Sequence, residues 1–383
     1  MRRSKFRKNI SRVLSACEPY DKFGWIDKNR EYRESKRELQ ENEYLESAPP
    51  LIFEWPSSIT KPYVGLVKSE KGNKAYWPKF ERFLKENNIP YDELDIKASN
   101  FIVECKKFDV VVWRTPSTYV EQWEAADKID YIQDYLDKLV LPSKEALWMY
   151  EDKIRLQWLL ELNGLPTIKS FISYSKEETA KYIENCEYPF ISKDKTCSGS
   201  EGVHLVKNKR QARKLWRKIF HHGLKLNNSY IRQKNYVLFQ EFVPNKGFDL
   251  RVIMVGDSYF GYYRYPKAND YRASGSGVVT KKDIPLEVLQ LAKKVRESLP
   301  DSYLLAVDFL QDTRNDKYYI IETSIFISID SCEQLVVDEV AGRYIEKDGK
   351  FTFEPGRFWL QELMMQEMMK RWIDKNLERE RLI

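Results

Sequence analysis

The stretch LLAVDFLQD-TRND-KYYIIETSI, residues 304–325, decides the fold. Two apolar runs flank the polar segment Asp312–Asp316, which is typical of a hairpin turn. If the hairpin is symmetric about Asn315, Asp308 and Glu322 lie directly opposite each other on neighbouring strands. Cross-strand partners have Cβ atoms about 5 Å apart. The sequence therefore predicts a close pair of carboxylates on one face of a sheet.

Such a carboxylate pair suits a metal ion. Two carboxylates at this separation repel each other unless a cation lies between them. Asp308 and Glu322 match a magnesium site that is completed by phosphate oxygens and water. Ser324, two residues after Glu322, points to the same face and is a third candidate ligand. The alternative is one exposed acid and one acid at a strand end, because this spacing is common in hairpins.

A candidate phosphate site precedes the hairpin. The segment Tyr188–Lys193 is a short apolar strand that ends in a lysine, and His204–Lys207 is its returning strand. Small residues between them let backbone N–H groups approach anionic oxygens, and the lysine adds a point charge. The candidate loop residues are Ser198, Gly199, Ser200 and Gly202. No G-K-[ST] closes the loop, so it is not a Walker loop, and an ordinary hairpin with a surface lysine is the alternative.

Three arginines lie between or near these features. Asp249 and Arg251 share one face of a predicted strand, Arg264 lies on the next strand, and Arg272 lies in the following small-residue loop. Guanidinium groups suit planar carboxylate and phosphate groups. The three arginines are therefore candidate catalytic residues, and the alternative is that each is a solvated strand residue.

Taken in chain order, these residues resemble the ATP-grasp superfamily across roughly residues 63–330. The similarity is greatest to the branch that holds the ribosomal-protein glutamate-adding ligases and the glutathione synthetases. The ordered set consists of Asp152-Lys153 at a helix start, Lys193 with its loop, the hinge Gln240-Glu241-Phe242-Val243, Asp249-x-Arg251, Arg264, Arg272, Asp308 and Glu322-x-Ser324.

The resemblance implies roles for these residues. Lys153 and Lys193 would hold the phosphates of ATP, the hinge 240–243 would contact adenine, and Asp249 would also line the nucleotide site. Asp308 and Glu322 would hold two Mg²⁺ ions, for which Mn²⁺ substitutes. The implied activity is the ligation of a carboxylate to an amine through an acyl phosphate, with release of ADP and phosphate. The substrates expected are a small-molecule, peptide or glycan carboxylate and an amine such as an amino acid.

Four positions depart from the family pattern. Ser324 stands where the family has Asn, Asp194 replaces Pro, and Cys197 and Ser200 replace Gly. Two alternatives therefore stay open, a phosphotransferase that acts on a hydroxyl group and a degenerate protein that binds nucleotide without turnover. ADP release that requires both a carboxylate and an amine distinguishes the ligase from both.

Composition sets the frame for this interpretation. A chain of 383 residues with 42% apolar and 32% charged residues is long enough for two or more cores. The five cysteines form no C-x-x-C pair, which indicates a reducing compartment and no structural zinc. No apolar run of 18 residues is present. We therefore expect a cytoplasmic enzyme with no transmembrane segment and no nucleic-acid partner, and a homo-oligomer stays open. The net charge of +6 mildly favours an acidic substrate.

The fold class predicted is α/β, with a small parallel-sheet domain followed by a two-lobed ATP-grasp domain of α+β type and by helical extensions at both ends. The expected boundaries are a charged helical extension at 1–48, the parallel-sheet domain at 61–142, the ATP-grasp domain at 143–335 with lobes at 165–243 and 244–335, and a C-terminal segment at 336–383.

Two helices are expected outside the strands. Ser143–Asn163 is predicted to be one helix, with Ser143 as N-cap and Gly164 after its end. The amphipathic segment Phe358–Ile373 is predicted to be the second, and its methionines suit either a partner surface or the chain's own core. We favour the core. The residues on its apolar stripe are Leu360, Met364, Met368 and Trp372.

Overall fold

The computed structural model describes residues 44–70, 75–117, 119–196, 202–225, 232–266 and 278–381. The chain forms two compact units, residues 1–47 with 71–75 and residues 48–70 with 76–383. In the first unit, the Ser47 hydroxyl donates a hydrogen bond to the Tyr44 carbonyl at 2.7 Å. The helical extension was expected at residues 1–48, and residues 1–43 of it lie outside the described part of the chain.

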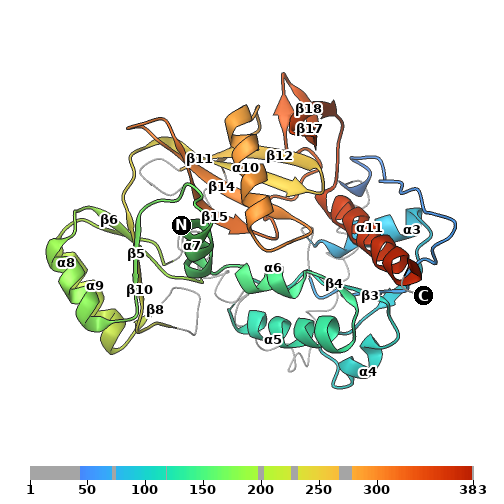
Figure 1. Cartoon of the computed structure of the whole chain (residues 1–383), viewed down its shortest axis with the longest axis horizontal. Coiled ribbons are helices and arrows are strands. Elements are labelled where there is room, and N and C mark those ends of the chain that lie inside the picture. The colour runs from blue at the N-terminus through green and yellow to red at the C-terminus, as the bar shows by residue number, and fades with distance from the viewer. Residues whose placement is uncertain are drawn as a thin grey trace, which may run out of the picture. The chain divides into compact units, whose positions relative to one another are not determined.

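A small parallel sheet opens the second unit, as predicted (Figure 1). Its order is β2-β1-β3-β4, and all three neighbouring pairs are parallel. Val64 and the run Val110–Val112 are fully buried, which is typical of parallel strands covered on both faces. The elements are β1 (Val64–Leu66), α3 (Trp77–Glu86), β2 (Tyr91–Glu93), α4 (Phe101–Cys105), β3 (Val110–Val112), α5 (Tyr119–Asp130), the π-helix η2 (Tyr131–Tyr135) and β4 (Leu139–Leu141).

The single helix predicted over Ser143–Asn163 is wrong. Two helices lie there, α6 (Lys144–Met149) and α7 (Lys153–Leu162). Glu151 between them has a left-handed backbone with φ of 56°, which no α-helix accommodates. The Asp152 carboxylate then caps α7 by accepting hydrogen bonds from the first-turn N–H groups. The helix start at Asp152-Lys153 implied by the resemblance is therefore correct.

An antiparallel four-stranded sheet follows, in the order β5-β10-β6-β7. The predicted strand that ends at Lys193 and its returning strand from His204 are confirmed as β6 and β7. Two helices, α8 and α9, pack on the sheet around Phe190, Ile219 and Phe239. The elements are β5 (Ser170–Ser173), α8 (Lys176–Asn185), β6 (Phe190–Lys193), β7 (His204–Val206), α9 (Lys209–His221), β8 (Leu224–Lys225), β9 (Arg232–Gln233) and β10 (Val237–Glu241).

The third sheet is the largest and has the order β15-β14-β11-β12-β17-β16, with β13 paired to β12 and β18 to β17. Helix α10 packs against β11 (Figure 1). Strands β17 and β18 extend this sheet past residue 335. The elements are β11 (Asn245–Val255), β12 (Ser258–Tyr265), β13 (Val278–Thr280), α10 (Leu286–Ser298), β14 (Leu305–Asp312), β15 (Tyr318–Ser324), β16 (Val336–Val337), β17 (Val340–Lys347) and β18 (Lys350–Pro355).

The hairpin of β14 and β15 has the predicted register at the two acidic residues. Asp308 pairs with Glu322. Beyond Asp308 the register shifts by one residue, so that Phe309 pairs with Ile320 and Ile321 forms a bulge. The bulge absorbs the difference between the actual turn and the symmetric turn assumed from the sequence.

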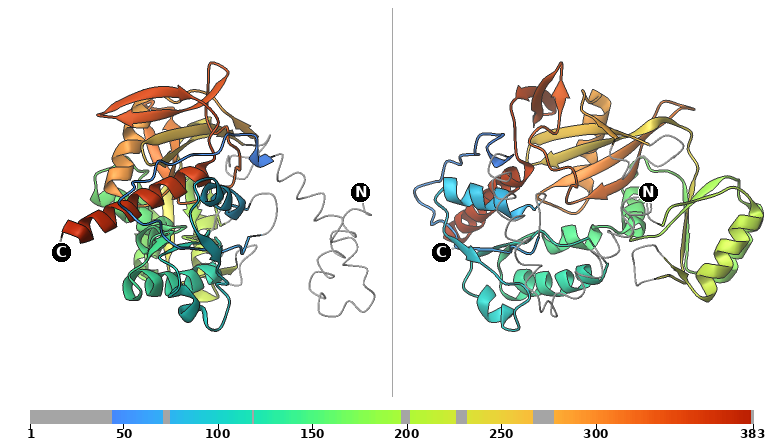
Figure 2. Two further views of the ribbon diagram at one scale, coloured as in Figure 1. Left: turned by 90° about the vertical axis from the view of Figure 1, so that its right-hand side faces the viewer. Right: turned by 180° about the vertical axis from the view of Figure 1, so that it is seen from behind.

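The last helix, α11 (Leu360–Arg381), lies beside α3 and also contacts β4 and β11 (Figure 2). Met365 and Met369 are fully buried in it, together with the predicted stripe residues Leu360, Met364 and Met368. The methionine-rich face is therefore core, which confirms the interpretation that we favoured.

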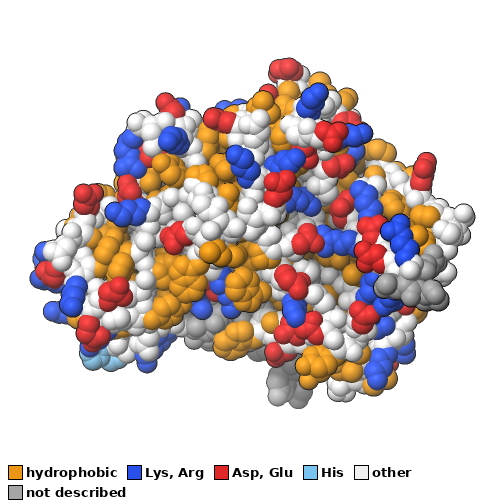
Figure 3. All heavy atoms as spheres, viewed as in Figure 1, with side chains coloured by type: hydrophobic (Ala, Val, Ile, Leu, Met, Phe, Trp, Pro, Cys, Tyr) orange, Lys and Arg blue, Asp and Glu red, His pale blue; other side chains and the backbone are white. Residues whose placement is uncertain are grey.

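The described surface carries both signs of charge. On the face shown in Figure 3, basic and acidic side chains are interspersed rather than gathered into one basic patch of the kind that nucleic-acid-binding surfaces carry. Among the described helices, none combines the length and the apolar character that crossing a membrane requires.

Candidate active site

Asp308 is the centre of a buried ionic network. Strand β11 runs between β12 and β14, and its Arg251 is in register with Asp308. The Arg251 guanidinium donates two hydrogen bonds to the two Asp308 carboxylate oxygens, at 2.6 and 2.8 Å. Arg264 on β12 donates a third, at 2.6 Å. Burial opposes ionisation, but the two arginines hold the pKa of Asp308 at about 2.

Asp249 completes this network. It pairs in register with Arg264, and the Arg264 Nε donates to its carboxylate at 2.5 Å. Burial and the nearby charge of Asp308 raise the pKa of Asp249 to about 6, against the opposing effect of Arg264. Arg251, Arg264, Asp249 and Asp308 therefore form one cluster from three adjacent strands, as the shared strand faces in the sequence suggested.

Glu322 faces Asp308 across the hairpin and binds a different cation. Its Oε1 lies 3.0 Å from the Nζ of Lys153, the first residue of α7, which packs against β15. Burial alone would lower the pKa of Lys153, but Glu322 and Glu151 raise it above the ordinary lysine value. The backbone N–H of Lys153 donates to the Lys195 carbonyl at 2.9 Å, which ties the start of α7 to the segment after β6.

Lys193 is the second lysine of the site and ends β6. Burial lowers the pKa of Lys193 to about 8, and the charge of Lys153 adds to that effect, while Glu322 and Asp308 partly oppose it. Within the described ranges, no ion pair to Lys193 is present. The charges of Glu322 and Asp308 thus act on its ammonium, which no ion pair occupies among the described residues.

Glu151 is a site residue that sequence reasoning missed. It is partly buried, and burial raises the pKa of its carboxyl to about 7, against the effect of Lys153. Its Oε2 has no hydrogen-bond partner in the part of the chain that the structure describes. Glu151 and Asp152 also line a cavity of about 460 Å³, together with Trp123 and Trp148. The family resemblance implied that a helix starts at Asp152-Lys153, and this was the one indication in the sequence that Glu151 lies outside a helix.

The hinge residues 240–243 connect two sheets. Gln240 and Glu241 end β10, and the chain then passes through Phe242 and Val243 into β11. The Glu241 N–H donates to the Lys169 carbonyl at 2.9 Å, and its carboxylate lies 2.7 Å from Arg314. Both contacts position the connecting backbone, which is the segment that the resemblance assigns to adenine.

Part of the predicted phosphate loop lies outside the described residues. This applies to Ser198, Gly199 and Ser200, and also to Arg272. Gly202 is described and has a left-handed φ of 69°, and its carbonyl accepts a hydrogen bond from the Asp194 N–H at 3.1 Å. Asp194, at the position where the family has Pro, is buried and accepts a hydrogen bond from the Tyr236 hydroxyl. The hydrogen bond from the Asp194 N–H to Gly202 therefore joins the two ends of the loop.

Ser324 lies on the Glu322 strand but is already hydrogen bonded. Its hydroxyl donates to the Phe326 carbonyl at 2.6 Å, and the residue is buried. The hydroxyl oxygen keeps lone pairs, so its role as a metal ligand stays a prediction. Its observed role is to fix the chain after β15.

The donor set fits Mg²⁺ only in combination with phosphate. Among the described residues, no group of three or more His, Cys, Asp or Glu side chains is arranged to hold a metal. Asp308 and Glu322 offer two opposed carboxylates, each balanced by protein cations. Magnesium keeps few protein ligands and takes the rest from phosphates and water. Phosphate groups would also give Lys153 a new partner, which would release Glu322 for the metal.

The fold and this site define an ATP-grasp protein. Residues 150–347 match the model of the RimK-like ATP-grasp domain, and the chain belongs to that family. Members of the family use ATP together with Mg²⁺. The structure is also similar to N5-carboxyaminoimidazole synthetase from Staphylococcus aureus, with a TM-score of 0.50 and 12% identity over 73% of this chain and 72% of that one. This likeness concerns the fold alone.

Two curated relatives have related sequences. The glutamate–LysW ligase ArgX of Sulfurisphaera tokodaii is 25% identical over 194 residues, which are 50% of this chain and 64% of that protein. The tetrahydromethanopterin:alpha-L-glutamate ligase of Methanocaldococcus jannaschii is 24% identical over 290 residues, which are 67% of this chain and 95% of that protein. The chain thus spans less than two thirds of the first relative.

Proposed function

We propose that this protein is an ATP-dependent ligase that joins a carboxylate to an amine. The observation that carries the proposal is the presence of Lys153, Lys193 and the Asp308–Glu322 pair at one site of a RimK-like ATP-grasp domain, where Lys153 pairs with Glu322 and both acids act on the pKa of Lys193. Two lysines beside two carboxylates match the requirements of a bound nucleotide triphosphate. We also propose that the ATP-grasp domain covers residues 143–335, after a parallel-sheet domain at 61–142.

The reaction divides into two steps. The γ-phosphoryl group of ATP passes to the substrate carboxylate and ADP leaves, and the amine then displaces phosphate from the acyl phosphate to form the amide. Lys153 and Lys193 bind the phosphates and offset the charge that develops during transfer. Arg251, Arg264 and Arg272 are our candidates for contacts to the acyl group, and the loop with Ser198, Gly199, Ser200 and Gly202 for excluding water.

Asp308 and Glu322 are the residues that would hold magnesium, with Ser324 beside them. Bound Mg²⁺ neutralises phosphate oxygens and orients them for in-line transfer. We propose two ions, which Mn²⁺ could replace. Asp249 adds negative charge at the same cluster, and the hinge Gln240-Glu241-Phe242-Val243 would contact adenine through its backbone.

The amine is proposed to be an amino acid, with L-glutamate as the first candidate, because both relatives are named for glutamate ligation. The carboxylate substrate is proposed to be a cofactor, a peptide or a carrier protein. The cavity lined by Glu151, Trp123 and Trp148 is a candidate place for that substrate.

A screen for ADP release tests the proposal. Candidate carboxylates and the twenty amino acids are supplied singly and in pairs with MgATP, and products are identified by mass spectrometry. We expect ADP release that depends on both substrates, with a product of amide mass. A phosphorylated product without amide would instead identify a phosphotransferase, and ATP binding without ADP release would identify a degenerate protein.

The first prediction concerns Ser324. Ser324→Ala removes a hydroxyl ligand and should raise the Mg²⁺ concentration for half-maximal rate, whereas Ser324→Asn restores the family residue and should lower it. Magnesium titrations at fixed ATP compare the two variants with the wild type. Because the hydroxyl also donates to the Phe326 carbonyl, thermal melting of each variant serves as the control. Identical magnesium curves would mean that Ser324 only fixes the chain after β15.

A second prediction concerns pH. Burial lowers the pKa of Lys193 to about 8, so its ammonium is charged below that pH and neutral above it. ATP phosphates bind the charged form, and ATP affinity should therefore fall as pH rises, by about tenfold between pH 7 and pH 9. Calorimetric titrations with MgATP check this. Lys193→Arg, which stays charged, should show a flat profile, and an equal decline in both proteins would contradict the assignment.

A further inference from the structure

An arginine and a glutamate lie at the carboxyl ends of two neighbouring parallel strands, outside the network around Asp308. Arg114 follows β3 by two residues and Glu70 follows β1 by four, and β1 pairs with β3. The Arg114 Nε lies 3.5 Å from the Glu70 Oε1. Crevices at the carboxyl ends of parallel strands are general ligand sites.

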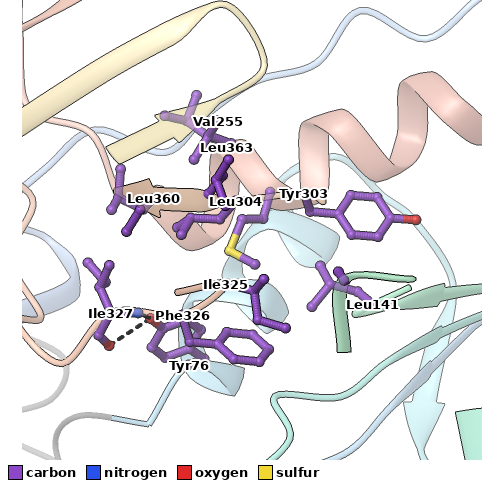
Figure 4. Close-up of a cluster of buried hydrophobic side chains, with 14 of the residues drawn as sticks. Tyr76, Leu141, Val255, Tyr303, Leu304, Ile325, Phe326, Ile327, Leu360 and Leu363 are labelled. Carbon is purple, nitrogen blue, oxygen red and sulfur yellow. Dashed lines mark hydrogen bonds between the residues drawn. The ribbon is translucent and has the colours of Figure 1, made fainter. Parts of the chain in front are cut away.

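Aromatic rings hold the Arg114 guanidinium in place. It lies 5.6 Å from the centre of the Tyr76 ring and 5.3 Å from that of Phe326. Tyr76 in turn fixes the segment that contains Phe326, because its hydroxyl exchanges hydrogen bonds with the backbone of Ile327 at 2.8 and 2.9 Å (Figure 4). Through Phe326, the arginine therefore contacts the segment that directly follows Ser324, a candidate ligand of the proposed metal site.

Three polar side-chain atoms that follow β3 have no hydrogen-bond partner among the described residues. In the described part of the chain, no hydrogen bond reaches the Arg114 Nε, the Thr115 hydroxyl or the indole N–H of Trp113, and Thr115 and Trp113 are buried. The Glu70 carboxylate, in contrast, has a hydrogen-bond partner, since its Oε2 accepts a hydrogen bond from the Tyr76 N–H at 2.7 Å. Buried polar groups without partners are rare and need an explanation such as a ligand.

Tyr150 lies between the surroundings of Arg114 and the candidate active site in the sense that charged groups of both act on it. Its ring lies 5.7 Å from that of Phe326. Burial raises the pKa of the Tyr150 hydroxyl, Glu151 and Glu322 raise it further, and Arg114 and Arg251 lower it. One hydroxyl is thus within electrostatic range of both Arg114 and the proposed catalytic groups.

The charges at this place favour a particular ligand. Arg251 and Arg264 already bind carboxylates, whereas the one ion pair of Arg114 among the described residues is the long contact to Glu70. A guanidinium group with free donors matches a planar carboxylate. Arg114 follows a strand of the parallel sheet, whereas the acid pair lies on β14 and β15 of another sheet, so we assign a carboxylate bound to Arg114 to the substrate that does not form the acyl phosphate.

We propose that Arg114 binds the α-carboxylate of the amine substrate, which makes that substrate an amino acid, and that Glu70 positions the guanidinium group. This inference rests on the proposed ligase function and deepens it. It excludes simple amines without a carboxylate, such as polyamines, as good substrates.

Binding of amino acids tests the inference independently of turnover. Calorimetry with a non-hydrolysable ATP analogue and Mg²⁺ measures binding of the twenty amino acids to the full chain. The tightest of them is then compared with its α-amide. We expect the wild type to prefer the acid by about 10- to 100-fold, the scale for one charge-assisted hydrogen-bonded pair. In Arg114→Gln this preference should disappear, while nucleotide affinity is unchanged.

Two further variants complete the test. Arg114→Lys keeps the charge but loses the planar fork, so an intermediate preference is expected, and it replaces Arg114→Gln if that variant does not fold. Glu70→Gln should weaken acid binding several-fold and raise the KM of the amino acid by a larger factor than it lowers kcat. The matched control is Arg371→Gln, because Arg371 also lies over a tyrosine ring, at 4.2 Å, and pairs with Asp301 at 2.6 Å.

The outcomes separate this inference from the ligase proposal. Binding of an amino acid with the expected preference, but without ADP release, would overturn the ligase function alone. No binding by any of the twenty amino acids, equal binding of acid and amide, or an unchanged preference in Arg114→Gln would overturn the role of Arg114. An effect of Arg114→Gln confined to the KM of the carboxylate substrate would overturn it as well.

Discussion

Asp308→Asn and Glu322→Gln are each expected to reduce ADP release below detection. Each removes one of the two opposed carboxylates that would hold the metal against the phosphates. The two variants should differ in stability. Asp308 is buried and neutralises Arg251 and Arg264, so its loss leaves buried charge and should cost about 3–5 kcal/mol of unfolding free energy. Glu322 is partly exposed, and among the described residues its one ion pair is with Lys153, so Glu322→Gln should stay close to wild-type stability.

The measurement is ADP release at a temperature where melting curves show every variant to be folded. Glu362→Gln is the matched control for Asp308→Asn, because Glu362 is also a buried acid paired with an arginine, Arg82, at 2.5 Å. It should lose stability and keep its turnover once folded. If both active-site variants release ADP within a few-fold of wild type, the magnesium assignment is wrong.

Lys153→Ala and Lys193→Ala should each weaken ATP binding and lower the rate by about 100-fold or more, the scale for one preorganised electrostatic group. The causes differ in part. Lys153→Ala also leaves Glu322 without its cation, which adds repulsion of the phosphates, whereas Lys193 has no ion pair among the described residues. Lys153→Ala should therefore have the larger effect on ATP affinity.

Calorimetry with MgATP and initial rates measure both effects. Lys293→Ala is a suitable control, because Lys293 pairs with Glu346 at 2.7 Å on the surface of the large sheet. A structure with bound nucleotide should show both ammonium groups next to phosphate oxygens. If either lysine points into solvent in that structure, its assignment fails.

The acid pair was predictable because a hairpin is local. Its turn residues and apolar runs can be recognised in one short stretch, and the pairing of Asp308 with Glu322 followed. The turn is not the one symmetric about Asn315 that was assumed from the sequence, and the bulge at Ile321 compensates for the difference. The residues around Ile321 do not indicate that a bulge lies there. The parallel sheet, the strand ending at Lys193 and the start of α7 were likewise predictable from local patterns and the family resemblance.

The partners of the charged residues were not predictable. Arg251 binds Asp308 because β11 pairs with β14 in one register, and a register between strands more than fifty residues apart depends on the whole sheet. Glu151 was missed for a different reason. The residues from Ser143 onward have continuous helical character, and the left-handed residue that breaks them, Glu151, carries no local signal, because tertiary context can override local propensity.

The position of α11 has a consequence for synthesis and for engineering. A ribosome makes α3, residues 77–86, long before the helix that lies against it, residues 360–381. The part of the second unit around α3 therefore stays incompletely packed until α11 has been made. For the same reason, a fragment that stops before residue 360 would expose apolar surface around β4 and β11, and affinity tags belong after residue 381 rather than within the helix.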